Sequence, residues 1–264
     1  MNLLKSAAAV SAMTMLSRIT GLIRETITAR LLGAGAESDA FFIAFRIPNL
    51  LRRLFAEGAF SQAFIPILSQ TNATEGKSAA VDLARRVSSL LFIALLLIVV
   101  AGVLGGSWVV MGMASGLGRG SEQFELTVLL TQWMFPYILL ISMVALASGL
   151  LNTFRSFALP AFAPVLLNIS FIAGALLLAP YFDQAVKAFA VAVMVGGVLQ
   201  VAVLWYGLAR TDCLINPFAG LGAIKSAWGD ERVRRVLKNM VPATLAVSVA
   251  QISLIINTNI ASHL

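Results

Sequence analysis

Long apolar runs separated by short polar segments dominate the chain. A membrane-spanning helix needs about 20 consecutive apolar residues, and this chain has several runs of that length. Four nearly uncharged runs lie at residues 87–112, 126–154, 158–180 and 187–209, and a fifth, 239–262, qualifies despite two asparagines. Two more, residues 6–32 and 40–70, have the length but contain charged side chains. The pattern predicts an all-α, polytopic membrane helix bundle of about seven transmembrane helices, forming a single lobe over residues 1–264.

The segments between these runs are polar or glycine-rich, as connections usually are. Leu32–Ala40 and Gly116–Gln123 are rich in glycine and predict tight turns, while Thr71–Arg86 predicts a polar loop. Pro136, between two apolar stretches, predicts a bend in the fourth span, because proline removes a helical hydrogen bond. Gly102 and Gly106 are four residues apart, which favours close helix packing.

Residues 218–238 form the middle of the longest connection and have a mixed pattern. Apolar Ile224, Trp228, Val233 and Leu237 alternate with arginine and lysine, as in a helix that lies in the plane of the membrane interface. The alternative is an ordinary helical extension of the last span. Both interpretations predict a helix here.

The composition supports a membrane protein. The chain is 59% hydrophobic and 12% charged, against about 25% charged in an average soluble domain. Its net charge of +7 would suggest nucleic acid in a soluble protein, but basic loops and anionic lipid explain it more simply here, so no nucleic-acid partner is expected. The single Cys213 and single His263 exclude an internal disulfide and argue against a metal centre or a histidine-based active site. No enzyme activity, catalytic residue or metal ligand is therefore expected.

The distribution of lysine and arginine between alternate connections predicts the orientation. With the N-terminus in the cytoplasm, the predicted cytoplasmic segments carry eleven Lys or Arg, and the opposite side carries only Arg119 and Lys187. Cytoplasmic loops of membrane proteins are enriched in these residues. We therefore expect a multi-pass protein of the cytoplasmic membrane with its N-terminus inside.

The first two predicted spans carry more charge than lipid-facing helices tolerate. An arginine at a helix centre costs about 2.5 to 3.5 kcal/mol on insertion scales, so such residues usually face a cavity or a partner. Between Arg18 and Glu57 the chain has six arginines and four acidic residues. The arginines are Arg18, Arg24, Arg30, Arg46, Arg52 and Arg53, and the acids are Glu25, Glu37, Asp39 and Glu57. The excess of positive charge at membrane depth is the strongest functional signal in the sequence.

All of these cations are arginine, which suits an anionic ligand. The planar guanidinium matches phosphate oxygens with two parallel hydrogen bonds and stays charged when desolvated. The residues thus indicate an internal cavity for a phosphate or pyrophosphate. Two alternatives stay open: Arg52 and Arg53 extend to the interface at the end of a shorter span, or Arg18 pairs with Glu25 as structural support. No phosphate-binding loop motif occurs, so transport driven by the chain's own ATP hydrolysis is not expected.

Three segments carry a resemblance to a known family. "SRITGLIRETITARLLGAGAESDAFFIAFRIPNLLRRLFAEGAFSQAFIPIL" resembles the opening of the MurJ/MviN family, which comprises the lipid II flippases of bacterial cell-wall synthesis within the MOP exporter superfamily. "FPYILLISMVALASGLLNTFRSFALPAFAPVLLNIS" and "VPATLAVSVAQISLIINTNIASHL" are similar to later helices of the family. The resemblance runs along the whole chain.

The resemblance implies a substrate, a mechanism and a set of residues. The substrate is undecaprenyl-pyrophosphate carrying a disaccharide-pentapeptide, and the mechanism is alternating access across the cytoplasmic membrane. Arg18, Arg24 and Arg52 match the family's cationic cavity. Glu25 stands where many relatives have Asp, Asp39 matches a gate acid, Glu57 a cavity acid, and Ala29 a small cavity-facing position. The implied partners are membrane lipid, lipid II and cell-wall synthesis proteins.

The chain departs from the family in length, because family members have about twice as many spans, arranged in two lobes. This chain matches the N-terminal lobe, and the family's coupling-ion site belongs to the other, so no cofactor or ion ligand is assigned here. Either the chain is a fragment or another chain supplies the missing C-terminal lobe. Two other functions stay open: an exporter of another polyprenyl-pyrophosphate-linked sugar, and a truncated, non-transporting membrane scaffold.

Overall fold

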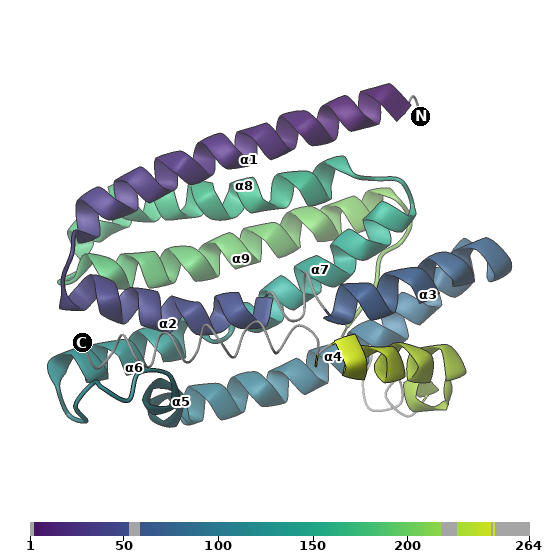
Figure 1. Ribbon diagram of the computed structural model, residues 1–264. Helices are drawn as coiled ribbons and strands as arrows, with labels where there is room; N and C mark the ends of the chain where they lie inside the picture. Colours follow the sequence, from purple (N-terminus) through teal and green to yellow (C-terminus); the bar gives the residue numbers. More distant parts are fainter. Residues whose placement is uncertain (1–2, 53–58, 218–225, 244, 246–264) are drawn as a thin grey trace.

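The computed structural model describes residues 3–52, 59–217, 226–243 and 245. Every regular element in these residues is a helix, as the apolar pattern predicted. The longer helices run roughly side by side along one axis (Figure 1). In chain order the α-helices are α1 Leu3–Leu32, α2 Ala36–Arg52, α3 Ala59–Glu75, α4 Lys77–Leu104, α5 Gly106–Met113, α6 Glu122–Met134, α7 Tyr137–Thr153, α8 Ala158–Ala173 and α9 Ala185–Arg210.

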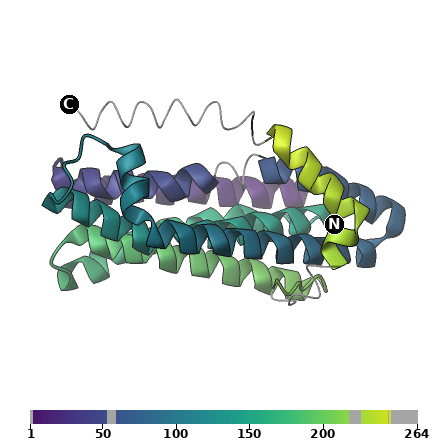
Figure 2. The ribbon, with the colours of Figure 1, turned by 90° about the horizontal axis from the view of Figure 1, so that it is seen from below.

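The central helix of the bundle is α9, which packs against α8 on one side and α7 on the other. α1 packs against α8, and α2 packs against α6. Figure 1 shows α1, α8 and α9 as a layer of neighbouring helices, with α2 and α7 beside it. α3 and α4 pack together, and Figure 2 shows α3 at one end of the bundle and α4 running along it. Most fully buried side chains belong to a single apolar core between these helices.

α1 lies at the edge of the bundle and is only partly covered. Its contacts are chiefly with α8, and apolar side chains along it stay exposed, including Met15, Ile19 and Leu22. A long helix with exposed apolar side chains on an open face is suited to contact lipid or another protein surface. The arginines of the first predicted span therefore lie on a helix that the rest of the described chain does not enclose.

The predicted polar loop at Thr71–Arg86 is wrong. α3 continues to Glu75 and α4 begins at Lys77, so Gly76 alone separates two helices. Gly76 has φ 88°, a left-handed conformation that is cheap only for glycine and that ends the first helix. Glu75 and Lys77 beside it are good helix formers, and polar side chains are as common on the exposed face of a helix as in a loop.

The other predicted connections agree with the structure. Gly33 has φ 61° in the turn between α1 and α2. The segment before α6 ends at Ser121, whose hydroxyl caps α6 by accepting from the Phe124 N–H at 3.2 Å. Pro136 separates α6 from α7, as expected. After α8, a short π-helical turn, Gly174–Leu178, and a 3₁₀ turn, Ala179–Tyr181, complete that span.

Four helical segments are long and apolar enough to cross a membrane. They are Lys77–Leu104, Glu122–Thr153, Ala158–Tyr181 and Ala185–Arg210, which overlap the four nearly uncharged runs. The predicted span at 6–32 is the continuous helix α1, and that at 40–70 divides into α2 and α3 around residues outside the described ranges. Most of the predicted span at 239–262 also lies outside them. The count of about seven is therefore not confirmed.

The helical segment that follows α9, at residues 226–229 and 231–243, packs against the start of α4 (Figures 1 and 2). Charged contacts hold it there. Arg232 binds Asp230 at 2.8 Å and Glu75 of α3 at 2.8 Å. Arg86 of α4 donates to the Ser226 carbonyl at 3.1 Å and lies 3.6 Å from Asp230. This helix overlaps the predicted 218–238, and residues 218–225 lie outside the described ranges.

Candidate functional site

The candidate site is a cavity of about 750 Å³ inside the bundle, formed by α1, α2, α3, α7, α8 and α9. One part of its wall is apolar, with Phe45, Ile65 and Leu167. The other part is polar. Its polar or charged lining residues are Ser17, Arg24, Glu25, Asn49, Ser61, Tyr137, Ser148, Asn152, Asn168 and Gln200. A large cavity with a few convergent polar groups is the usual form of a ligand site.

Arg24 is the only cation in the described lining of this cavity. Its side chain is 26% exposed, and its Nη2 lies 3.1 Å from the carboxylate of Glu25, which is 71% exposed. That contact engages one of the guanidinium nitrogens, and arginine has five N–H donors. Arg24 therefore keeps donors for an anionic ligand while Glu25 limits where the side chain points.

An aromatic cluster supports Arg24 from the other side. The guanidinium carbon lies 5.4 Å from the ring centroid of Phe171 on α8, which is within cation–π range. Phe171 is buried and contacts the rings of Phe41, Phe45 and Phe189 at centroid distances of 5.9 to 6.3 Å. Since α2, α8 and α9 all contribute to the cluster, the position of the guanidinium depends on how these helices pack.

Two buried amides hold the polar wall together. Asn168 of α8 donates through Nδ2 to the Ser17 carbonyl at 3.0 Å and to the Thr20 hydroxyl at 3.1 Å, which ties α8 to α1. Gln200 of α9 donates through Nε2 to the Ala163 carbonyl at 3.0 Å. Its Oε1 is buried and has no hydrogen-bond partner among the described residues. A buried acceptor of this kind favours a hydrogen-bond donor in the cavity.

The structure brings together only some of the residues selected from the sequence. Arg24 and Glu25 both line the cavity, whereas Arg18 and Ala29 are exposed on α1 and are not among its lining residues. Glu25 pairs with its neighbour Arg24 and not with Arg18, which removes one of the two structural alternatives. Asp39 is exposed in the first turn of α2, away from this cavity.

Two predicted site residues cannot be placed. Arg52 is the last residue of α2, and its side chain lies outside what the structure describes; Glu57 lies outside the described residues altogether. The described lining carries one arginine and one glutamate. The predicted excess of positive charge therefore depends on Arg18 and Arg52 and stays a prediction.

The neutral polar side chains of the cavity were missed by reasoning from charge. Asn168 and Gln200 are the clearest examples, because each interrupts a strongly apolar span. An uncharged amide at that depth needs a partner or a cavity, which is a signal that the sequence already contains. Within the described chain no cluster of three His, Cys, Asp or Glu could hold a metal ion. The polar groups of the described lining are those of a cavity that can hydrogen-bond a polar ligand.

Comparison with known sequences identifies a family. The family model described as lipid II flippase MurJ matches residues 28–264. The lipid II flippase MurJ of Burkholderia cenocepacia is 54% identical over 264 residues, which cover 100% of this chain and 51% of that protein. The probable lipid II flippase MurJ of Vibrio cholerae is 40% identical, covering 99% of this chain and 50% of its own length. The chain thus spans about half the length of the curated relatives it matches.

Comparison with solved structures gives the same result for the fold. A lipid II flippase MurJ in an inward closed conformation superposes with a TM-score of 0.74 at 25% identity, over 96% of this chain and 50% of that one. A MATE transporter in complex with MaD3S superposes with a TM-score of 0.73 at 15% identity, over 95% of this chain and 55% of that one. Both matches cover about half of the larger protein.

Proposed function

Because this chain belongs to the lipid II flippase MurJ family, we propose that it forms the N-terminal lobe of a transporter that moves lipid II across the bacterial cytoplasmic membrane. The family places the chain in a multi-pass bacterial membrane protein, in agreement with its four apolar spans. The substrate, the direction of transport and the need for a second lobe are parts of this proposal.

The observation that carries the proposal is the position of Arg24 in the polar wall of the cavity. The pyrophosphate of undecaprenyl-pyrophosphate is doubly anionic or more at neutral pH, and guanidinium groups bind such oxygens through paired, charge-assisted hydrogen bonds. Arg24 is partly buried, so its field is screened less than that of an exposed arginine. We assign Arg24 as a pyrophosphate ligand, with Arg18 and Arg52 as further cations that approach it during transport.

The neutral wall suits the rest of the headgroup. Sugar hydroxyls and peptide amides both donate and accept hydrogen bonds, and Asn152, Ser148 and Gln200 offer neutral partners in the same cavity. We propose that these side chains contact the disaccharide-pentapeptide while the polyprenyl tail stays in lipid. Glu25 and Glu57 would then limit the net charge of the cavity, and Asp39 would act near the outer gate.

Alternating access requires a second body that moves against this lobe. The open face of α1 carries Arg18 and is available for such a body, with exposed Met15, Ile19 and Leu22 beside it. We propose that the N-terminus lies in the cytoplasm, that a C-terminal lobe packs along this face, and that cell-wall synthesis proteins take up the product. No cofactor or coupling ion is assigned to this lobe.

Complementation in a bacterium depleted of its own MurJ tests the proposal. We expect growth when the chain is produced together with the C-terminal half of the Burkholderia relative, and none with the chain alone. Arg24→Ala in the same pair should abolish growth, whereas the matched control Arg30→Ala, on an exposed position of the same helix, should support it. Growth supported by Arg24→Ala at normal membrane levels would overturn the assignment of Arg24.

Binding measurements separate this substrate from related lipids. The purified pair should bind lipid II more tightly than undecaprenyl phosphate, since the second phosphate and the sugars add contacts, and Arg24→Ala should reduce that difference. Equal affinity for a different polyprenyl-pyrophosphate-linked sugar would indicate the alternative exporter, and stable membrane expression with neither binding nor growth would indicate a non-transporting scaffold.

A further inference from the structure

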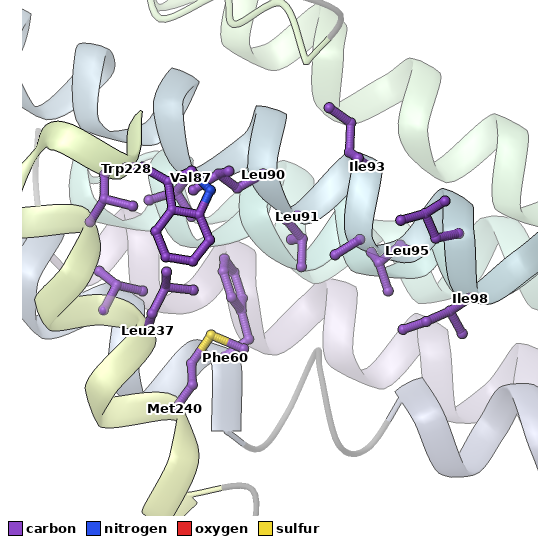
Figure 3. A pocket seen from close by; sticks show the side chains of 14 residues that line it. Phe60, Val87, Leu90, Leu91, Ile93, Leu95, Ile98, Trp228, Leu237 and Met240 are labelled. Carbon is purple, nitrogen blue, oxygen red and sulfur yellow. The ribbon is translucent and has the colours of Figure 1, made fainter. Parts of the chain in front are cut away.

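Two hollows of this lobe differ in their chemistry. The hollow between α4 and the helical segment at 226–243 has a volume of about 370 Å³, and every side chain that lines it is apolar or aromatic (Figure 3). The cavity of about 750 Å³ inside the bundle has amides of α8 and α9 in its lining, namely Asn168 and Gln200. Of these two, the bundle cavity is the one suited to select a ligand by hydrogen bonds.

The amide of Asn168 has both of its donors occupied. Nδ2 donates to the Ser17 carbonyl at 3.0 Å and to the Thr20 hydroxyl at 3.1 Å. A carbonyl can only accept, so these partners identify which branch of the amide is the nitrogen. No described residue donates a hydrogen bond to the other branch, Oδ1. Asn168 is 6% exposed, so its oxygen is an acceptor with a fixed orientation inside the bundle.

Gln200 repeats this arrangement on α9. Its Nε2 donates to the Ala163 carbonyl at 3.0 Å, which again identifies the nitrogen. Its Oε1 is buried and has no partner among the described residues, and the residue as a whole is 3% exposed. Each of the two amides thus joins α8 to a neighbouring helix through its nitrogen and keeps its oxygen available.

A backbone carbonyl adds a third acceptor next to Gln200. Pro164 lies inside α8 and has no N–H, so the Pro160 carbonyl lacks the donor that normally lies four residues further along a helix. Pro160, Ala163 and Pro164 line the same cavity as Gln200. This stretch of the wall therefore presents acceptors, which bind hydroxyl or N–H groups and not the oxygens of a phosphate.

The acceptors begin one helical turn from the arginine that we assign to the pyrophosphate. Phe171, whose ring centroid lies 5.4 Å from the Arg24 guanidinium carbon, is three residues after Asn168 on α8. Three residues correspond to about 4.5 Å along a helix, and the five residues from Ala163 to Asn168 correspond to about 7.5 Å. The wall thus changes from a donor at Arg24 to acceptors along α8, toward the N-terminal end of that helix.

We propose that Asn168 and Gln200 determine specificity for the headgroup, and that their amide oxygens accept hydrogen bonds from the hydroxyl and acetamide N–H groups of the sugar joined directly to the pyrophosphate. This inference rests on the proposed function for the position of the pyrophosphate at Arg24. Because the acceptors begin so close to Arg24, the group that reaches them is the next one along the headgroup, which is the first sugar.

Two lipids that differ only in one sugar test the proposal, namely undecaprenyl pyrophosphate and undecaprenyl-pyrophosphoryl-N-acetylglucosamine. Their equilibrium affinities are measured in detergent for the purified pair of this chain and the C-terminal half of the Burkholderia relative. One hydrogen bond contributes about 2- to 10-fold in affinity, so two such bonds predict that the sugar raises the affinity at least about 4-fold.

A substitution on α9 and a matched control test the residues. Gln200→Met removes one acceptor while keeping the length of the side chain, and should reduce the gain from the sugar by about 2- to 10-fold without changing the affinity for undecaprenyl pyrophosphate. Gln132→Met is the control. Gln132 of α6 also donates through Nε2 to a carbonyl of a neighbouring helix, that of Val103 at 3.0 Å, but it does not line the cavity. It should leave both affinities unchanged, whereas Arg24→Ala should weaken both.

The outcomes are distinct. Equal affinity of the parent pair for the two lipids would overturn the proposal, and this comparison needs no variant to fold. A Gln200→Met variant that keeps the full gain from the sugar, or that weakens both lipids equally, would also overturn it, since Gln200 would then only join α9 to α8. Failure of the proposed function gives a different result: a pair that prefers the sugar-bearing lipid but does not bind lipid II would keep these acceptors and exclude lipid II as the substrate.

Discussion

The guanidinium of Arg24 on α1 lies over the ring of Phe171 on α8, with 5.4 Å between the guanidinium carbon and the ring centroid. This contact joins the edge helix to the core, because Phe171 is buried among aromatic side chains of α2 and α9. A cation–π contact leaves the N–H donors of the guanidinium available for hydrogen bonds. The contact therefore fixes the position of the Arg24 side chain while its N–H donors stay available to a phosphate.

Replacing Phe171 with Leu should weaken ligand binding without unfolding the lobe. Leucine keeps apolar volume but removes the π face, whose contribution is about 0.5 to 1 kcal/mol at a partly exposed site. We expect lipid II affinity to fall by about 2- to 5-fold. Phe171→Tyr is the control, since it retains the ring. An equal loss of affinity in both variants would mean that packing, not the cation–π contact, sets the effect.

Replacing Asn168 with Ala should destabilise the lobe. The amide makes two hydrogen bonds to α1, to the Ser17 carbonyl and the Thr20 hydroxyl, and it is 6% exposed. Loss of such a buried group costs about 1 to 3 kcal/mol, so the midpoint of thermal unfolding in detergent should fall. Asn152→Ala, at another amide of the same cavity, is the matched control. An unchanged midpoint in Asn168→Ala would show that α1 is held to α8 by apolar packing alone.

Replacing Gly102 with Ala should disrupt the packing of α4 on α6. A Cβ atom at Gly102 would lie 2.0 Å from the ring of Phe135, so the ring or the helix must move. Overpacking of this kind costs about 1 to 3 kcal/mol. Gly112→Ala has open space around it and should be neutral or stabilising by about 0.5 to 1 kcal/mol. Thermal unfolding of the two variants side by side measures the difference, and equal midpoints would contradict the close approach.

Acidification should release the helix at 231–243 from α4. Hydrogen bonds from Arg232 are the main reason that the pKa of Asp230 lies below its ordinary value of 3.8, and partial burial only offsets them. A carboxyl whose folded-state pKa is lowered contributes stability that is fully present above its unfolded pKa. That contribution is lost as the pH falls through the folded value. The docking should therefore be constant near neutral pH and weaken below about pH 4.

The exposure of Trp228 to a soluble quencher measures this release. In the parent protein we expect exposure to rise as the pH is lowered below the ordinary pKa of the carboxyl. In Asp230→Asn the exposure should already be higher at pH 7 and should change less with pH, because the titrating group is gone. Identical pH profiles in the two proteins would assign the acid sensitivity to other groups.

Much of this fold follows from the order of apolar and polar residues. The four runs of sufficient length form four apolar helical segments, because a helix satisfies the backbone hydrogen bonds of such a run within the segment itself. The turn at Gly33 and the turn before Ser121 were also predicted correctly, because both segments are rich in glycine. The loop predicted at Thr71–Arg86 failed, because polarity does not distinguish a solvated helix from a loop, and a single left-handed Gly76 was enough to turn the chain.

The sequence by itself determined that the protein is helical, with apolar segments long enough to cross a membrane, because hydrophobic length is a local property. Only the tertiary structure decided which of the candidate site residues share a cavity. It placed Arg24 and Glu25 there with Asn168 and Gln200, and left Arg18 on an open helix face. The direction in which a helix face points is set by the helices packed against it. These neighbours can lie more than 100 residues away in the sequence, as Asn168 does from Ser17.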